Sequence, residues 1–297
     1  MEDKKEHINE EIWFSSVSKE ELNKYDVEVA FAAFQQRVKD SRQDKASFLH
    51  RRLWHIAAAI AALIVVGFFS FKSGENNIET DMGNIVVEAP QGCRTQITLP
   101  DGTIVWLNAG TKISYSQGFS LVNRNVSLVG EGYFEVAHND RLPFSVMSDE
   151  VQVNVLGTKF NFRDYPMDTE ATVSLSEGSV SMCTKKDSFK EQILKPGERA
   201  IVDKRTGKIH VEEYEVSNSR QWISGKLIFD GEPLHEIVKT LERSYNVKII
   251  IKGEHLKKLC FYGDFLRQEQ SLGEVLEALA ATGKLHYKRE AQYFILY

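Results

Sequence analysis

Apolar residues between about 85 and 216 recur at every second position in short runs, which is the pattern of half-buried β-strands. Turn sequences separate these runs: LPDGT at 99–103, KPGE at 195–198 and RTGK at 205–208 each contain a glycine that accepts a positive φ. No helical period interrupts them. We therefore predict an all-β domain, solenoid- or sandwich-like, over residues 85–220. The alternating positions are Ile97 and Leu99; Val151, Val153 and Val155; Phe160 and Phe162; Val173 and Leu175.

The period changes after Trp222, where strand and helix patterns alternate. Ser271 followed by Glu274 has the spacing of a capping box and predicts a helix start. Two strand–helix–strand units predict a small α+β domain over residues 221–297. The expected strands are 227–229, 247–251, 261–265, 285–287 and 293–296, and the helices carry Leu234, Ile237, Val238 and Leu241, then Leu272, Val275, Leu276 and Leu279.

Residues 53–71 contain no Asp, Glu, Lys or Arg, which is about the length needed to cross a bilayer as a helix. A buried helix of a soluble domain is the alternative, because the strictly apolar part covers only residues 56–69. Basic residues flank the segment unequally: Arg37, Lys39, Arg42, Lys45, Arg51 and Arg52 precede it, and only Lys72 follows within twenty residues. Cytoplasmic flanks are enriched in Lys and Arg. We therefore expect a single-pass bacterial inner-membrane protein with a cytoplasmic N-terminus, a polar linker at 72–84 and a periplasmic C-terminus.

The N-terminal residues 1–52 show one helical pattern, formed by Val27, Phe31, Phe34 and Val38 on a single face. Trp13 adds a further apolar side chain. A segment of this size buries too little apolar surface to fold readily alone. The pattern therefore predicts a head that binds a partner through this face; the alternative is a solvated tail with a chance apolar stripe.

The net charge, the cysteine spacing and the motifs of the chain exclude several classes of function. The net charge of −5 gives no basic surface for nucleic acid. Cys93, Cys183 and Cys260 lack the spacing of a disulfide framework or zinc site. The chain contains none of the common motifs for a metal, a cofactor or a hydrolytic triad. We expect no cofactor, no metal and no enzymatic activity.

Eight short motifs follow one another along residues 100–227. They are PDGT at 100–103, VWLNA at 105–109, LVGEGYFEV at 128–136, PFSV at 143–146, VLGTKFNF at 155–162, LSEGSV at 175–180, LKPGERA at 194–200 and WISGKL at 222–227. Singly these motifs are weak, but their combination and order are specific. Together they strongly resemble the FecR family of transmembrane anti-sigma regulators, and the resemblance covers residues 85–297. The C-terminal part is similar to the secretin and TonB short N-terminal domain found in this branch of the family.

The resemblance implies a cell-surface signalling protein. Its head would bind an extracytoplasmic-function sigma factor, and its periplasmic domains would engage the N-terminal signalling domain of a TonB-dependent outer-membrane transporter. The imported substrate could be a ferric siderophore or a glycan. Signal transfer is expected to involve an intramembrane protease acting near residues 53–80. The head is shorter than in many members, so both inhibition and assistance of the sigma factor stay open.

Two further hypotheses, self-cleavage and glycan binding, depend on particular residues. Some members of the family cleave themselves at a Gly-Thr pair, which corresponds here to Gly157 and Thr158; the hydroxyl would need a base or strain, and the pair also suits a turn at the start of a strand. The rival function is an anchored periplasmic glycan or ligand binder that uses Trp106 and Tyr115 as exposed aromatics.

Overall fold

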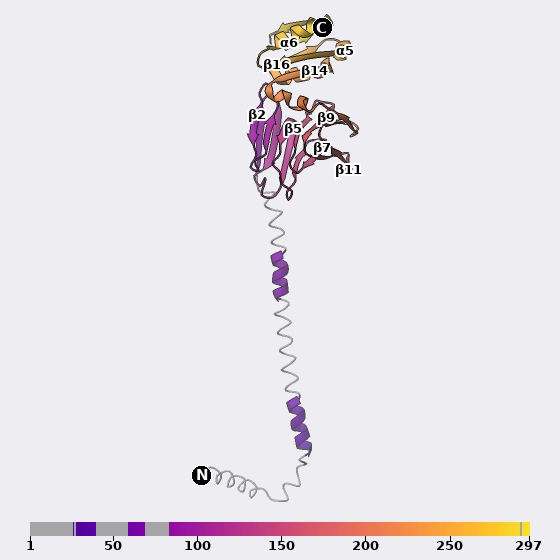
Figure 1. Cartoon of the computed structure of the whole chain (residues 1–297). Helices are drawn as coiled ribbons and strands as arrows, with labels where there is room; N and C mark the ends of the chain where they lie inside the picture. Colours follow the sequence, from indigo (N-terminus) through magenta and orange to yellow (C-terminus); the bar gives the residue numbers. More distant parts are fainter. Residues whose placement is uncertain (1–25, 27, 40–58, 69–82, 292) are drawn as a thin grey trace. The chain divides into compact units, whose positions relative to one another are not determined.

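The computed structural model describes residues 26, 28–39, 59–68, 83–291 and 293–297 (Figure 1). The chain divides into two compact units, residues 1–75 and 76–297. In the first unit, residues 28–39 and 59–68 are helical. Within the described ranges, no helix combines the length and apolar character needed to span a membrane. Parts of the predicted span, residues 53–58 and 69–71, lie outside these ranges, as do 72–82 of the predicted linker.

The second unit begins with a large curled sheet, here called the β domain (Figure 1). The strands run in the order β11-β10-β7-β6-β5-β8-β9-β12-β13; β4 and β1 continue from one part of β5, and β3 and β2 from the other. Among the described strands β1 to β13, β5 and β6 form the one parallel pair. The strands are β1 (Asn84–Ala89), β2 (Thr95–Thr98), β3 (Ile104–Leu107), β4 (Thr111–Ser116), β5 (Arg124–Glu135), β6 (Phe144–Met147), β7 (Val151–Val155), β8 (Lys159–Asp164), β9 (Glu170–Glu177), β10 (Val180–Thr184), β11 (Asp187–Leu194), β12 (Glu198–Asp203) and β13 (Ile209–Glu213).

The curl depends on β5, which belongs to both halves of the sheet. Its first residues pair with β4 and β6, and its last six pair with β8. Between them Gly130 has φ +117°, and a Cβ there would lie 2.5 Å from Thr111 Oγ1. Only glycine fits this bend without strain. The two halves of the sheet therefore fold onto one core, in which the rings of Phe134 and Phe160 stack 5.0 Å apart.

The C-terminal domain has its own core and confirms the predicted α+β pattern. β14 pairs antiparallel with β16, while β18 lies between β15 (parallel) and β17 (antiparallel). Ser271 and Glu274 form the predicted capping box at the start of α6. The elements are the 3₁₀ helix η1 (Val216–Ser224), β14 (Lys226–Pro233), α4 (Leu234–Tyr245), β15 (Lys248–Ile251), α5 (Glu254–Lys257), β16 (Cys260–Leu266), α6 (Leu272–Ala280), β17 (Tyr287–Glu290) and β18 (Tyr293–Leu296).

The predicted largely β fold with a small α+β part is confirmed, with differences in detail. The last strand pair starts at Tyr287 rather than Leu285, and the short helix α5 was not expected. Helix η1 occupies the predicted boundary at residue 220, because its C-cap Gly225 takes a left-handed conformation that ends the turn and starts β14. The two domains therefore join through a 3₁₀ helix.

Candidate functional site

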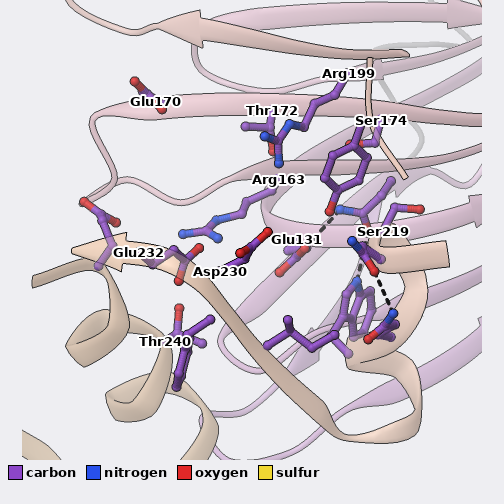
Figure 2. A pocket seen from close by; sticks show the side chains of 18 of the residues that line it. Glu131, Arg163, Glu170, Thr172, Ser174, Arg199, Ser219, Asp230, Glu232 and Thr240 are labelled. Atoms are coloured by element: carbon purple, nitrogen blue, oxygen red, sulfur yellow. Dashed lines mark hydrogen bonds between the residues drawn. The ribbon is translucent and has the colours of Figure 1, made fainter. Parts of the chain in front are cut away.

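A cleft of about 780 Å³ lies at the junction of the β domain and the C-terminal domain (Figure 2). Strands β8, β9, β12 and β13 line one side, and η1, β14 and α4 line the other. Carboxylates outnumber cationic side chains along its wall. We call this feature the junction cleft; its charged lining residues are Glu131, Asp168, Glu170, Glu212, Glu213, Glu215, Asp230, Glu232 and Glu236, with Arg163, Arg199, Lys226 and Arg243.

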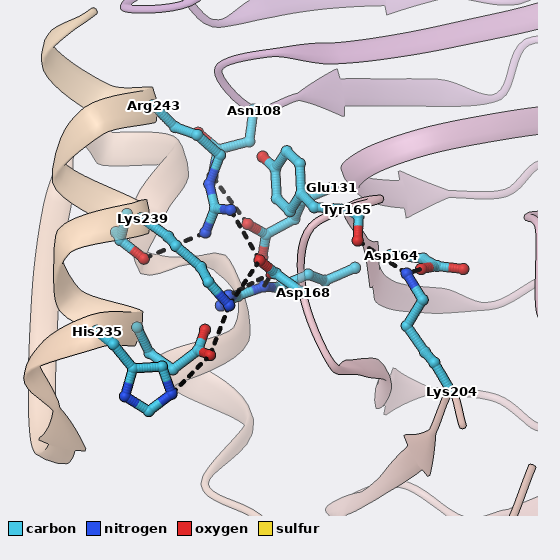
Figure 3. Close-up of polar contacts among 12 residues, drawn as sticks. Asn108, Glu131, Asp164, Tyr165, Asp168, Lys204, His235, Lys239 and Arg243 are labelled. Atoms are coloured by element: carbon cyan, nitrogen blue, oxygen red, sulfur yellow. Dashed lines mark hydrogen bonds and ion pairs between the residues drawn. The ribbon is translucent and has the colours of Figure 1, made fainter. Parts of the chain in front are cut away.

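Asp168 joins the two domains at one edge of the junction cleft (Figure 3). It follows β8 and accepts hydrogen bonds from Arg163 of β8, at 2.7 Å from Nη2, and from Arg243 of α4, at 3.0 Å from Nη1. Its side chain is only 4% exposed. Burial opposes ionisation of Asp168, but the two guanidinium groups hold its pKa below the ordinary value. Asp168 is therefore an ionised carboxylate shared between the domains.

The guanidinium groups around Asp168 are fixed by further contacts. Arg243 lies 4.0 Å above the ring of Tyr165, whose hydroxyl donates to the Ala109 carbonyl. Burial raises the pKa of the Tyr165 hydroxyl. Burial alone would lower the pKa of Arg163, but the carboxylates of Glu131 and Asp168 more than offset this and raise it. These groups keep fixed charges across the physiological pH range.

A second polar chain crosses the base of the cleft. The indole Nε1 of Trp222 donates to Asn161 Oδ1 at 3.0 Å, and Asn161 Nδ2 donates to Glu131 Oε1 at 3.0 Å. Glu131 also accepts from Asn108 Nδ2 at 2.9 Å. The buried Trp222 of η1 is thus tied to strands β8 and β5 and to the turn between β3 and β4. Together with Asp168, this chain fixes the angle between the domains at two separate points.

Glu232 of β14 lies in the cleft, near Arg163 and Glu131 (Figure 2). Burial raises its pKa, and repulsion from Glu236 and Glu131 adds to this, while Arg163 opposes it. An ionised carboxylate in this position carries a free-energy cost at neutral pH. Because charged side chains line the cleft, its electrostatic field would attract or repel a charged group. Among the described residues, no cluster of His, Cys, Asp and Glu has metal-binding geometry.

The predicted sigma-binding residues are placed only in part. Phe31 and Phe34 are 60% and 61% exposed on helix 28–39, and Val38 is 37% exposed. Their spacing puts all three on one face of the helix, and their role in binding a partner stays a prediction. Trp13 and Val27 lie outside the described residues.

The hydroxyl of Thr158 is engaged in a hydrogen bond within the β domain. Thr158 is 4% exposed, and its hydroxyl donates to the Ser179 carbonyl at 3.0 Å. A Cβ on Gly157 would lie 2.5 Å from Nδ1 of His138, so only glycine fits there. Strand β8 begins at the next residue, Lys159. This geometry favours the structural role of the pair as a turn at the start of a strand.

The rival glycan site loses its proposed aromatics. Trp106 and Tyr115 are half-buried rather than exposed. Tyr115 packs on the core and lies 5.3 Å from the ring of Phe119, and Trp106 lies 5.8 Å from Tyr133. Both side chains stabilise the sheet, so the expectation of an exposed aromatic platform was wrong.

Sequence reasoning missed the junction residues Arg163, Asp168 and Arg243. Asp168 and Arg243 are 75 positions apart, and no periodicity links residues at that separation. Around Asp168 the sequence shows a polar turn between two apolar strands. Such turns are common at the edge of any sheet. Charged side chains that join two domains are visible only when the domains are in place.

Comparisons with known proteins agree with the fold. The family described as FecR protein matches residues 85–181, and the family described as FecR, C-terminal matches residues 226–296. Two crystal structures of a candidate anti-sigma factor from Parabacteroides distasonis ATCC 8503 are similar, each with 31% sequence identity over 72% of this chain. The TM-scores are 0.66 and 0.67, and 98% and 99% of those chains are covered. Among curated proteins, none matches this chain.

Proposed function

Because this chain belongs to the FecR family of anti-sigma factors, we propose that residues 1–52 bind an extracytoplasmic-function sigma factor. In the same proposal, residues 85–297 engage the N-terminal signalling domain of a TonB-dependent outer-membrane transporter. The chain is a signalling regulator, and binding energy rather than catalysis transmits the signal.

The observation that carries the head's role is the exposed aromatic face of helix 28–39. Phe31 and Phe34 leave about three fifths of their surfaces in solvent. Burying each ring in a partner's groove contributes roughly 1.5–3 kcal/mol. An amphipathic helix that lays such a face into a groove is a common recognition mode. This supports a protein partner for the head.

The apolar helix at 59–68 supports a membrane position for residues 53–71. Consecutive side chains from Leu63 to Val66 are each more than half exposed, so they cover every side of the helix. A helix that is apolar all round requires apolar surroundings. With the charge asymmetry of its flanks, this favours a single pass of the bacterial inner membrane with the N-terminus in the cytoplasm.

Capture of the sigma factor by the full chain tests the central proposal. The chain, purified in detergent, is expected to retain an extracytoplasmic-function sigma factor of its own organism, and the double substitution Phe31→Ala with Phe34→Ala should weaken capture at least about tenfold. Val29→Ala is the matched control, because Val29 is 64% exposed but lies on the opposite face of the helix. Equal capture by the double variant and the control would contradict the proposal.

Signal transfer is proposed to end in regulated proteolysis near residues 53–80. A single helix has few other ways to carry a change across a membrane. Cells that lack every intramembrane protease should therefore keep the sigma factor inactive when the transporter is loaded. Unchanged sigma activity in such cells would refute this step without affecting the binding proposal.

A further inference from the structure

Four aliphatic side chains are exposed at the end of the β domain where the chain enters from residue 82. Ile85 and Val86 of β1 are 37% and 51% exposed, and Leu121 and Val122 of the β4–β5 loop are 82% and 44% exposed. Ile85 and Val86 are consecutive in a strand and face opposite sides of the sheet, so the four residues form an apolar rim at this end rather than one flat face. The backbone N–H of Gln117 donates to the Gly83 carbonyl at 3.2 Å, so the start of β1 and this loop lie side by side. We call these four residues the tether patch.

The loop that carries Leu121 and Val122 is preformed. Both backbone N–H groups donate to the Gly118 carbonyl at 3.1 Å, and Ser120 has φ +73°. Beneath them Phe119 is 2% exposed and packs 6.1 Å from Phe144. The aliphatic side chains are therefore held outward by a fixed backbone, and little conformational entropy would be lost when they bind a surface.

The tether patch lies in an uncharged part of the surface sequence. Residues 83–87 and 113–123 contain no Asp, Glu, Lys or Arg. The next residue, Arg124, is buried and paired with Asp101. The opposite end of the β domain instead carries the ion pairs of Asp168 and Arg243 to the C-terminal domain. Charged side chains reach this end on the neighbouring loop before β6, where Asp140 and Arg141 are exposed and Leu142 accepts a hydrogen bond from Arg124. Exposed aliphatic side chains flanked by such charges suit the interfacial layer of a membrane.

The position of the tether patch along the chain indicates its partner. Sixteen residues, 69–84, separate its first residue, Ile85, from the apolar helix at 59–68, and even fully extended they reach at most about 58 Å. A short tether raises the effective concentration of the patch at the surface that holds the other end. We propose that the tether patch rests in the interfacial layer of the bilayer that contains residues 53–71. This inference depends on the proposed membrane span.

Docking would orient the protein. Because the C-terminal domain binds the opposite end of the β domain through Asp168 and Trp222, a docked tether patch points that domain away from the inner membrane. The C-terminal domain and the junction cleft would then face the periplasmic space, where a transporter's signalling domain could reach them.

Fluorescence quenching in nanodiscs tests the docking. The full chain is reconstituted in nanodiscs with brominated lipids and carries an environment-sensitive dye at a single cysteine. Leu121→Cys reports the tether patch, and Ile64→Cys reports the span. Met167→Cys is the matched control, because Met167 is 81% exposed but lies in the β8–β9 turn at the other end of the domain. The native cysteines replaced by serine are Cys93, Cys183 and Cys260.

The three positions separate the possible failures. We expect a blue shift and lipid quenching at positions 64 and 121, and neither at 167. Quenching at 64 without quenching at 121 would overturn the docking and leave the span intact. No quenching at 64 would instead refute the span, and the docking with it. A blue shift at 121 that brominated lipid does not quench would place a protein surface there and also overturn the proposal.

Discussion

Helix 28–39 and the β domain use the same kind of side chain in opposite ways. Phe31 and Phe34 are 60% and 61% exposed, whereas Phe134 and Phe160 are 0% exposed and stack on each other. The β domain closes its core with its own strands, while every described residue of the helix is exposed. The β domain is thus a self-sufficient folded body, whereas the helix leaves its apolar face exposed, as expected if the proposed protein partner covers it.

The largest effect is expected when a phenylalanine is replaced by alanine in each of the two regions. Phe160→Ala should destabilise the β domain by about 3–5 kcal/mol, because it removes a buried ring and leaves a cavity. Phe34→Ala should change the free energy of unfolding by no more than about 0.5 kcal/mol, because its ring contacts mainly solvent. Urea denaturation of the full chain, followed by tryptophan fluorescence, measures both. A similar loss for Phe34→Ala would mean that the head has a core of its own.

Sequence reasoning predicted the parts of the fold that depend on local patterns. Val151, Val153 and Val155 are buried in β7 as their alternation required, and the capping box at Ser271 is formed. The bend of β5 at Gly130 was not predicted, because a glycine in a strand run fits several roles. The junction was not predicted either, since the Asp168–Arg243 pair depends on packing between domains rather than on either domain's pattern.

The next largest effect concerns the ion pairs that join the β domain to the C-terminal domain. Asp168→Ala leaves Arg163 and Arg243 without their shared carboxylate in a largely buried site, and should cost about 3 kcal/mol. The loss should appear as easier separation of the two domains, measured as faster amide hydrogen exchange in η1 and α4. The cores of both domains should keep their protection. Glu170→Ala, on the same wall of the cleft, is the control and should change little.

A smaller effect is expected at Thr158. Thr158→Val keeps the shape of the side chain but removes the hydrogen bond to the Ser179 carbonyl, and should cost about 1 kcal/mol. If the residue is structural, mass spectrometry will find the purified wild-type chain intact and the variant only less stable. Fragments ending at Gly157 in the wild type and absent from the variant would instead establish self-cleavage.

The smallest effect depends on pH and concerns Glu232. Its pKa is raised in the folded protein, mainly by burial, so its ionised form reduces stability above that pKa and its protonated form does not. Glu232→Gln should therefore raise Tm at pH 7. The gain should shrink as the pH falls through the folded pKa and should vanish below the ordinary value of 4.5. A gain that is constant between pH 7 and pH 4 would show that lost packing or hydrogen bonding, rather than the charge in the junction cleft, separates the two proteins.

Asp168 responds in the opposite direction. Its lowered pKa means that the ionised carboxylate stabilises the junction at neutral pH, and this contribution is lost only as the pH falls through that lowered value. Between pH 7 and pH 4 the contribution of Asp168 should therefore stay constant while that of Glu232 changes, which distinguishes the carboxylate that holds the domains together from the one that is destabilised in the junction cleft.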